Sequence, residues 1–168
     1  MTMKHLTRLT AVLVPLALAG CGTLQQSASY DREFKPQPGM KVEIGPVLNL
    51  SGSTNIADIV PLFRDALGEE LTNNNIQWNS TLTGIHLVLS AKIVEYVPGS
   101  SIKRWIVPGW GSAAMTVHCE LKDSSSRTML GWLQVRRTIT VAGFDGWHAV
   151  MCDVADEIAD QLAGKLSH

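Results

Sequence analysis

Charge is sparse in this chain. Only 17% of its 168 residues are charged, and 14 Lys and Arg stand against 15 Asp and Glu. This balance gives no basic surface and so no electrostatic case for nucleic-acid binding. Long hydrophobic runs are also missing. The longest one, Leu9–Leu18, has about ten residues, whereas a membrane-spanning helix needs about 20.

The sequence also lacks the spacings that mark catalytic and metal sites. No two histidines of the body have the short spacing of a zinc site, and no Gly-x-Ser-x-Gly nucleophile motif occurs. The loop Ser51-Gly52-Ser53-Thr54 has neither the second Gly nor the Lys of a phosphate-binding loop. Asp145 and His148, three residues apart, fit a helix cap beside an exposed histidine. We therefore expect no enzyme activity, no cofactor and no metal ion.

What the chain does have is a leader. Residues 1–8 carry Lys4 and Arg8 and no acid, and the short apolar run that follows ends in small residues. This order is typical of a secretory signal peptide rather than a membrane span. The leader ends at Leu18-Ala19-Gly20-Cys21.

These four residues resemble the lipobox of bacterial lipoproteins. The resemblance implies cleavage before Cys21, a diacylglycerol on its thiol and an acyl chain on its new amine. Two or more acyl chains give stable membrane anchoring, whereas a single chain binds marginally. In that family an Asp after the cysteine retains the protein in the inner membrane; because Gly22 stands there, the outer membrane is favoured.

Residues 21–40 read as a flexible tether. They have few large apolar side chains, no periodicity and the turn-forming run Lys35-Pro36-Gln37-Pro38-Gly39. A flexible chain of about 20 residues would span roughly 25 Å. The three parts of the chain are then the signal peptide (1–20), the lipidated Cys21 with its tether (21–40) and one domain (41–168).

Within the domain, alternating and 3.6-residue hydrophobic patterns predict five strands and two helices. Pro46 puts the first strand at an edge or at a bend, and Arg137 breaks the parity of the last strand, which predicts a bulge or a strand end there. The fold expected is a two-layer α+β sandwich, with a mostly antiparallel sheet and both helices on one face. The strands are Lys41–Leu50, Ile76–Asn79, Gly84–Val97, Ala113–Lys122 and Met129–Val141, and the helices are Asp58–Asn73 and Trp147–Lys165.

Two stretches, residues 63–71 and 104–130, carry a wider resemblance. They are similar to the first helix and to the loop, strand and turn of a family of small uncharacterised bacterial lipoproteins. More distantly, the element order resembles small domains of lipoproteins that activate cell-wall synthases or assemble secretion pores. Those lipoproteins act by protein contact, so the resemblance implies no catalytic residue.

Two cysteines remain in the domain. An oxidising periplasm would permit a disulfide between Cys119 and Cys152. Cys119 points to the apolar side of its strand, whereas Cys152 lies off the apolar stripe of its helix. Two separate thiols are therefore favoured over the bridge.

Aromatic residues in two Gly-containing connections are the strongest hint of function. Trp and Arg are enriched where partners bind, although these rings could instead fold back onto the core. The residues are Lys103, Arg104, Trp105, Trp110, Phe144 and Trp147. We expect a non-catalytic envelope lipoprotein that contacts a protein partner; the alternative is a periplasmic binder of a small molecule or glycan through the loop tryptophans.

Overall fold

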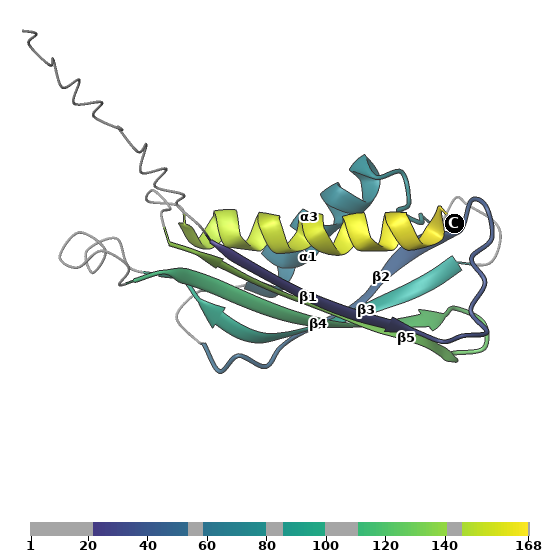
Figure 1. The fold of residues 1–168 in the computed structure, drawn as a ribbon, viewed down its shortest axis with the longest axis horizontal. Coiled ribbons are helices and arrows are strands. Elements are labelled where there is room, and N and C mark those ends of the chain that lie inside the picture. The colour runs from purple at the N-terminus through teal and green to yellow at the C-terminus, as the bar shows by residue number, and fades with distance from the viewer. Residues whose placement is uncertain (1–21, 54–58, 80–85, 100–110, 141–145, 168) are drawn as a thin grey trace, which may run out of the picture.

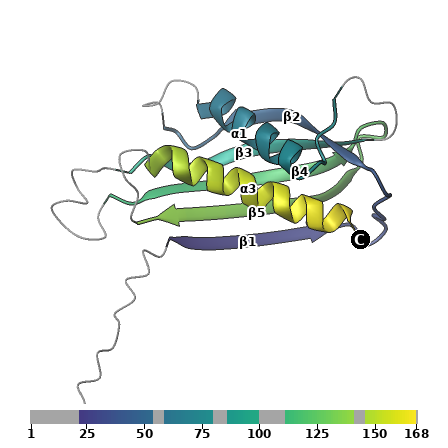
Figure 2. The same cartoon turned by 90° about the horizontal axis from the view of Figure 1, so that it is seen from above.

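Five strands form one sheet in the order β1-β5-β4-β3-β2, and two helices cover one of its faces (Figures 1 and 2). The computed structural model describes residues 22–53, 59–79, 86–99, 111–140 and 146–167. Only β2 and β3 are parallel; the other neighbouring strands are antiparallel. The elements are β1 (Thr23–Tyr30), β2 (Lys41–Asn49), α1 (Ile59–Asn73), β3 (His86–Val97), β4 (Ala113–Asp123), β5 (Met129–Ile139) and α3 (Gly146–Leu166).

The core lies between the sheet and the helices. Alternate residues of each central strand point to this side, as Met115, Val117 and Cys119 do in β4, and all three are fully buried. The apolar stripes of both helices close the core from above, with α3 over β4 and β5 and α1 over β2. The predicted two-layer α+β fold is confirmed.

The tether predicted over residues 21–40 is wrong over much of its length. Residues 23–30 form β1, which pairs antiparallel with β5 from Thr23↔Thr138 to Tyr30↔Gly131. Seven of the eight β1 residues are exposed, so the sequence shows no buried stripe. Backbone pairing with β5 makes the strand, and the folded domain therefore starts at Thr23 rather than Lys41.

The strand predicted at Ile76–Asn79 is only an isolated bridge. Gln77 pairs with Val42, where the Val42 N–H donates to the Ile76 carbonyl (2.7 Å) and the Trp78 N–H donates to the Val42 carbonyl (2.9 Å). The fifth strand of the sheet is β1 instead. The edge position expected for β2 is confirmed, and its register shifts between Ile44 and Val47, around Pro46.

No bulge occurs at Arg137. It stays in register opposite Met115, and β5 continues to Ile139. Its side chain points to the helix side of the sheet, where Nε lies 2.9 Å from a carboxylate oxygen of Asp153 on α3. The charge therefore breaks the apolar alternation because an acid of α3 pairs with it at the rim of the core.

Two glycines of the β1–β5 pair allow a close approach that a side chain would block. A Cβ on Gly131 would lie 2.6 Å from Cδ1 of Tyr30 and 2.8 Å from the Ser29 carbonyl oxygen, and a Cβ on Gly22 would overlap the Thr138 carbonyl oxygen. Tyr30 can therefore turn over β5, where it packs against the core. Lys165 of α3 lies above its ring, with Nζ 5.2 Å from the centroid.

We expect Gly131→Ala to loosen β1 from the sheet. The added methyl group must displace the Tyr30 ring or the Ser29 backbone, and overpacking of this kind costs about 1–3 kcal/mol of unfolding free energy. Urea denaturation of the purified protein would measure the loss. Gly164→Ala is the matched control, because a Cβ at that exposed position of α3 meets nothing within 4 Å. Equal stability of Gly131→Ala and the wild type would contradict this prediction.

Candidate interaction site at the open edge of the sheet

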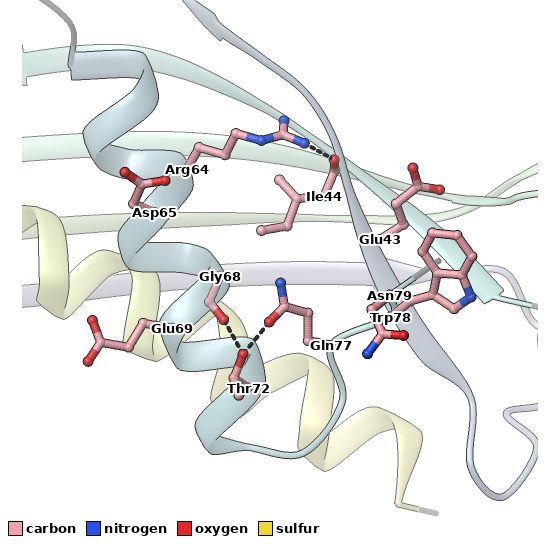
Figure 3. Close-up of a pocket in the computed structure, with 10 residues that line it drawn as sticks. All are labelled: Glu43, Ile44, Arg64, Asp65, Gly68, Glu69, Thr72, Gln77, Trp78 and Asn79. Carbon is pink, nitrogen blue, oxygen red and sulfur yellow. Dashed lines mark hydrogen bonds between the residues drawn. The ribbon is translucent and has the colours of Figure 1, made fainter. Parts of the chain in front are cut away.

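A groove of about 580 Å³ lies between α1, the outer edge of β2 and residues 77–79 (Figure 3). Most of the side chains around it are polar, and three of them, Glu43, Asp65 and Glu69, are carboxylates. The only basic group in its wall is the guanidinium of Arg64. The groove is therefore a water-accessible, mainly acidic recess.

The Arg64 side chain hydrogen-bonds to the backbone of β2. Its two terminal nitrogens donate to the carbonyl oxygens of Gly45 and Ile44, each at 2.6 Å, and Figure 3 shows the bond to Ile44. Next to it, Val42 is already paired with residues 76–78. Together with Pro46, which has no N–H, these contacts seal the β2 edge against another strand.

The remaining groove contacts are structural. The Thr72 hydroxyl donates to the Gly68 carbonyl within the same helix (2.7 Å) and lies against the side-chain oxygen of Gln77. Beside the groove, Trp78 stacks on His86 (centroids 4.1 Å apart), and a ring nitrogen of His86 lies 3.0 Å from Glu43. Among the described residues, no three His, Cys, Asp or Glu side chains are grouped as metal ligands.

The other edge of the sheet, β1, is open. It ends the strand order, so within the described residues no strand pairs with its outer side. Its sequence, Thr-Leu-Gln-Gln-Ser-Ala-Ser-Tyr, has no charge and no proline, which are the usual protections of an edge strand. Its pairing with β5 has no register shift. An open edge of this kind can accept a strand from another protein.

The face of the sheet opposite the helices is polar, as expected, and its charges are paired. Glu120 accepts hydrogen bonds from Lys92 (2.5 Å) and Lys122 (2.9 Å), which lower its pKa to about 2, the Lys92 bond contributing most. Glu95 accepts from Arg136 (2.9 Å) and from the Thr116 hydroxyl (2.6 Å), and both bonds lower its pKa, the Arg136 bond contributing most.

Of the six contact residues predicted from the sequence, the structure describes only Trp147. Trp147 is half-buried at the start of α3, packs against the core and meets His148 edge-on, with centroids 5.5 Å apart. The contact surface and the alternative of a ligand bound by loop tryptophans therefore stay predictions. Lys103, Arg104, Trp105, Trp110 and Phe144 lie outside the described residues, as do Leu18, Ala19, Gly20 and Cys21.

Cys119 and Cys152 are both free in the structure. Complete burial raises the pKa of Cys119. Cys152 is half-buried, with Sγ 3.7 Å from Nδ1 of His148; burial, followed by the nearby Glu70 carboxylate, raises its pKa. In both groups the raised pKa favours the thiol over the thiolate, and the thiol is the poorer nucleophile.

The sequence also matches a known family. The family model described as "Domain of unknown function (DUF4410)" matches residues 49–143. The chain belongs to this family. No curated protein matches the DUF4410 chain significantly. The expected membership in an uncharacterised family of small proteins with an α+β domain is thus confirmed.

Solved structures share the fold of this DUF4410 protein at low sequence identity. The PelC dodecamer from Paraburkholderia phytofirmans is 16% identical with a TM-score of 0.60, covering 85% of this chain and 98% of PelC. An uncharacterised protein is 13% identical with a TM-score of 0.50, covering 76% of this chain and 92% of its own. A minor lipoprotein from Acinetobacter baumannii is a looser match, at 13% identity and a TM-score of 0.42, covering 75% and 94%.

The open edge is the feature that sequence reasoning missed. One weak signal was present, because Leu24, Ala28 and Tyr30 share a parity and the residues between them are small or polar. That parity is the helix-facing one, since Ala28 pairs with Leu133 and Tyr30 with Gly131. With so little apolar surface the pattern does not stand out from a linker.

Replacing Arg64 tests the sealing of the β2 edge. Arg64→Met leaves the Ile44 and Gly45 carbonyls without their charged donor, and we expect a loss of about 1–2 kcal/mol in unfolding free energy. The bared edge should also promote concentration-dependent association, measured by sedimentation velocity. Arg32→Met, at an exposed position far from the groove, is the control. If both variants behave alike, Arg64 does not seal the edge.

A second prediction concerns Glu120 and pH. Its folded-state pKa lies below the ordinary 4.5, so its contribution to stability is complete above pH 4.5 and is lost as the pH falls toward 2. Because both lysines are partly exposed, we expect Glu120→Gln to cost only about 1 kcal/mol at pH 7. Unfolding curves between pH 7 and pH 2 should show the two proteins converging in acid. Glu33→Gln is the exposed control, and a pH-independent gap would refute the assignment.

Proposed function

We propose that this protein is a lipid-anchored, non-catalytic accessory module of the bacterial envelope that binds a protein partner along β1. One observation carries the proposal: an open, uncharged edge strand begins two residues after the lipobox cysteine. The lipobox resemblance supplies the anchor at Cys21. The open edge supplies a surface that recognises protein backbone by strand addition.

The anchor and the domain are directly coupled. Gly22 lies against the carbonyl of Thr138, and the α-carbons of consecutive residues are about 3.8 Å apart. Acyl chains on Cys21 would therefore hold the body next to the bilayer, with no long tether between them. β1 would then be presented to proteins of the same membrane or its immediate surroundings.

Three observations support contact rather than catalysis. Burial raises the pKa of both described thiols, the Thr72 hydroxyl is bonded to its own helix, and most of the side chains that line the groove are polar. The PelC protein of the same fold assembles into a dodecamer, which supports a role in assembly for this chain as well. No described helix is long and apolar enough to cross a membrane.

We assign the anchor to the outer membrane rather than the inner one, because Gly22 is not the Asp that retains lipoproteins. The fold gives position 22 a second requirement for glycine. An aspartate there would collide with the Thr138 carbonyl oxygen, so it would disturb the β1–β5 pair as well as the sorting signal.

The anchor is tested by replacing Cys21 with alanine in cells fed labelled palmitate. The wild type should be labelled and sediment with membranes. The variant should carry no label and be recovered in the soluble fraction, because no acyl chain remains. Equal labelling of both proteins would remove the basis of the proposal.

The binding edge is tested with a photo-crosslinking amino acid in intact cells. Placed at Ser27, in the middle of β1, it should yield one dominant adduct with an envelope protein that mass spectrometry identifies. Placed at Ser125, in the exposed turn between β4 and β5, it should give little or none of this adduct. An adduct of equal yield from both positions, or none from Ser27, would refute β1 as the binding site.

A further inference from the structure

At one end of the sheet, the described residues carry no charge. Thr23, Thr138, Ala114 and Val97 form a row across β1, β5, β4 and β3, and the row marks the end from which β1 starts. The described residues at this end include no Asp, Glu, Lys or Arg. They are residues 22–24, 97–99, 111–115, 138–140 and 146–147.

The opposite end is densely charged. It is formed by the segment from Tyr30 to Lys41 and by the β4–β5 turn, which lie at the other limits of the same strands (Figure 2). Eight charged side chains are found in these two segments. They are Asp31, Arg32, Glu33, Lys35, Lys41, Lys122, Asp123 and Arg127.

Large exposed apolar side chains are more numerous at the uncharged end than at the charged end. Leu24, Val94 and Val97 are exposed at or near the uncharged end, whereas Met129 is the one large apolar side chain described as exposed at the charged end. Of the other exposed leucines, Leu48 is in β2, Leu50 follows β2 and donates its N–H to the Ile93 carbonyl, and Leu62 is in the first turn of α1.

Two arginines near the uncharged end are paired, whereas Asp156 and Glu157 of α3 line a recess together with Leu24. Arg136 pairs with Glu95 on the open face, and Arg137 pairs with Asp153 on the helix side, both with Nε–O distances of 2.9 Å. Contact of the row Thr23, Thr138, Ala114 and Val97 with a surface of low polarity would desolvate no charged side chain of the row itself. Burial of an unpaired charge is the largest penalty such contact can carry.

We propose that this uncharged end is a membrane-contact surface that lies against the interfacial layer of a phospholipid bilayer. The inference rests on the proposed function, because acyl chains on Cys21 would enter the bilayer next to Gly22, at this same end. The exposed Leu24 and Val97 meet the lipid, and the half-buried Trp147 lies close to the headgroups, where tryptophan is enriched. The strands then run away from the membrane, and the charged end faces water.

Two positions of equal exposure make a matched test. Val97 is 45% exposed and Met129 is 44% exposed, at opposite ends of the sheet. Each is changed to Cys in the full-length lipidated protein carrying Cys152→Ala, since Cys119 is fully buried. An environment-sensitive fluorophore is attached, and the protein is reconstituted in phosphatidylethanolamine–phosphatidylglycerol vesicles with or without spin-labelled lipid.

We expect the fluorophore at position 97 to emit at shorter wavelength on the vesicles and to be quenched by spin-labelled lipid at least twofold more than at position 129. Equal quenching, or stronger quenching at position 129, overturns the inference. Thr23→Cys against Ser125→Cys is a second pair, at exposed positions of the same two ends, in case Val97→Cys misfolds.

Flotation of the vesicles separates this inference from the proposed function. If the lipidated protein floats with vesicles and the Cys21→Ala variant does not, the anchor is present, and equal quenching then refutes only the contact surface. If the two proteins float alike, the anchor itself is refuted.

Discussion

The pairing of β1 with β5 is the constraint on which the rest of the molecule depends. It requires backbone approaches that only glycine permits, at Gly22 against Thr138 and at Gly131 against Tyr30. The first contact ties Gly22, at the start of the described chain, to the sheet. The second lets the Tyr30 ring pack against the core, where Lys165 of α3 makes a cation–π contact with it. A segment with almost no buried side chains is thus fixed by backbone hydrogen bonds and by one aromatic residue at its end.

This pairing also gives the sheet two unlike edges. At β2, Arg64 and the bridge with residues 76–78 occupy the outward carbonyls and amides, and Pro46 removes a donor. At β1 none of these devices is present among the described residues. Exposed edges promote aggregation unless they are protected, and this contrast between the two edges is the reason for proposing a partner at β1.

Most of the fold could be predicted from the periodicity of apolar residues. The prediction failed where an element is held by backbone hydrogen bonds or by an ion pair rather than by buried apolar side chains. β3, β4, β5 and both helices were predictable because one face of each is apolar. β1 was not, since an edge strand with exposed side chains looks like a linker. The bulge or strand end predicted at Arg137 was wrong for a different reason. Asp153 of α3 pairs with the guanidinium, so a charged residue can occupy a helix-facing position of β5. The candidate site could not be predicted, because its residues come from segments that are far apart in the sequence. The hydrogen bonds from Arg64 to β2, for example, correspond to no local sequence pattern.

If Cys21 carries the proposed anchor, the anchor restricts what can pair with β1. Two copies joined by antiparallel pairing of their β1 strands would have their Thr23 ends at opposite ends of the shared ladder. The seven intervals between eight residues, at about 3.4 Å each, would separate those ends by about 24 Å along the strand direction. If the strands run away from the bilayer, both ends cannot meet the same membrane surface. Under the proposed anchoring, antiparallel β1–β1 pairing of two copies on one membrane is therefore excluded. The pairing strand would instead come from a different protein, or from another copy in an arrangement that leaves both anchors on one side.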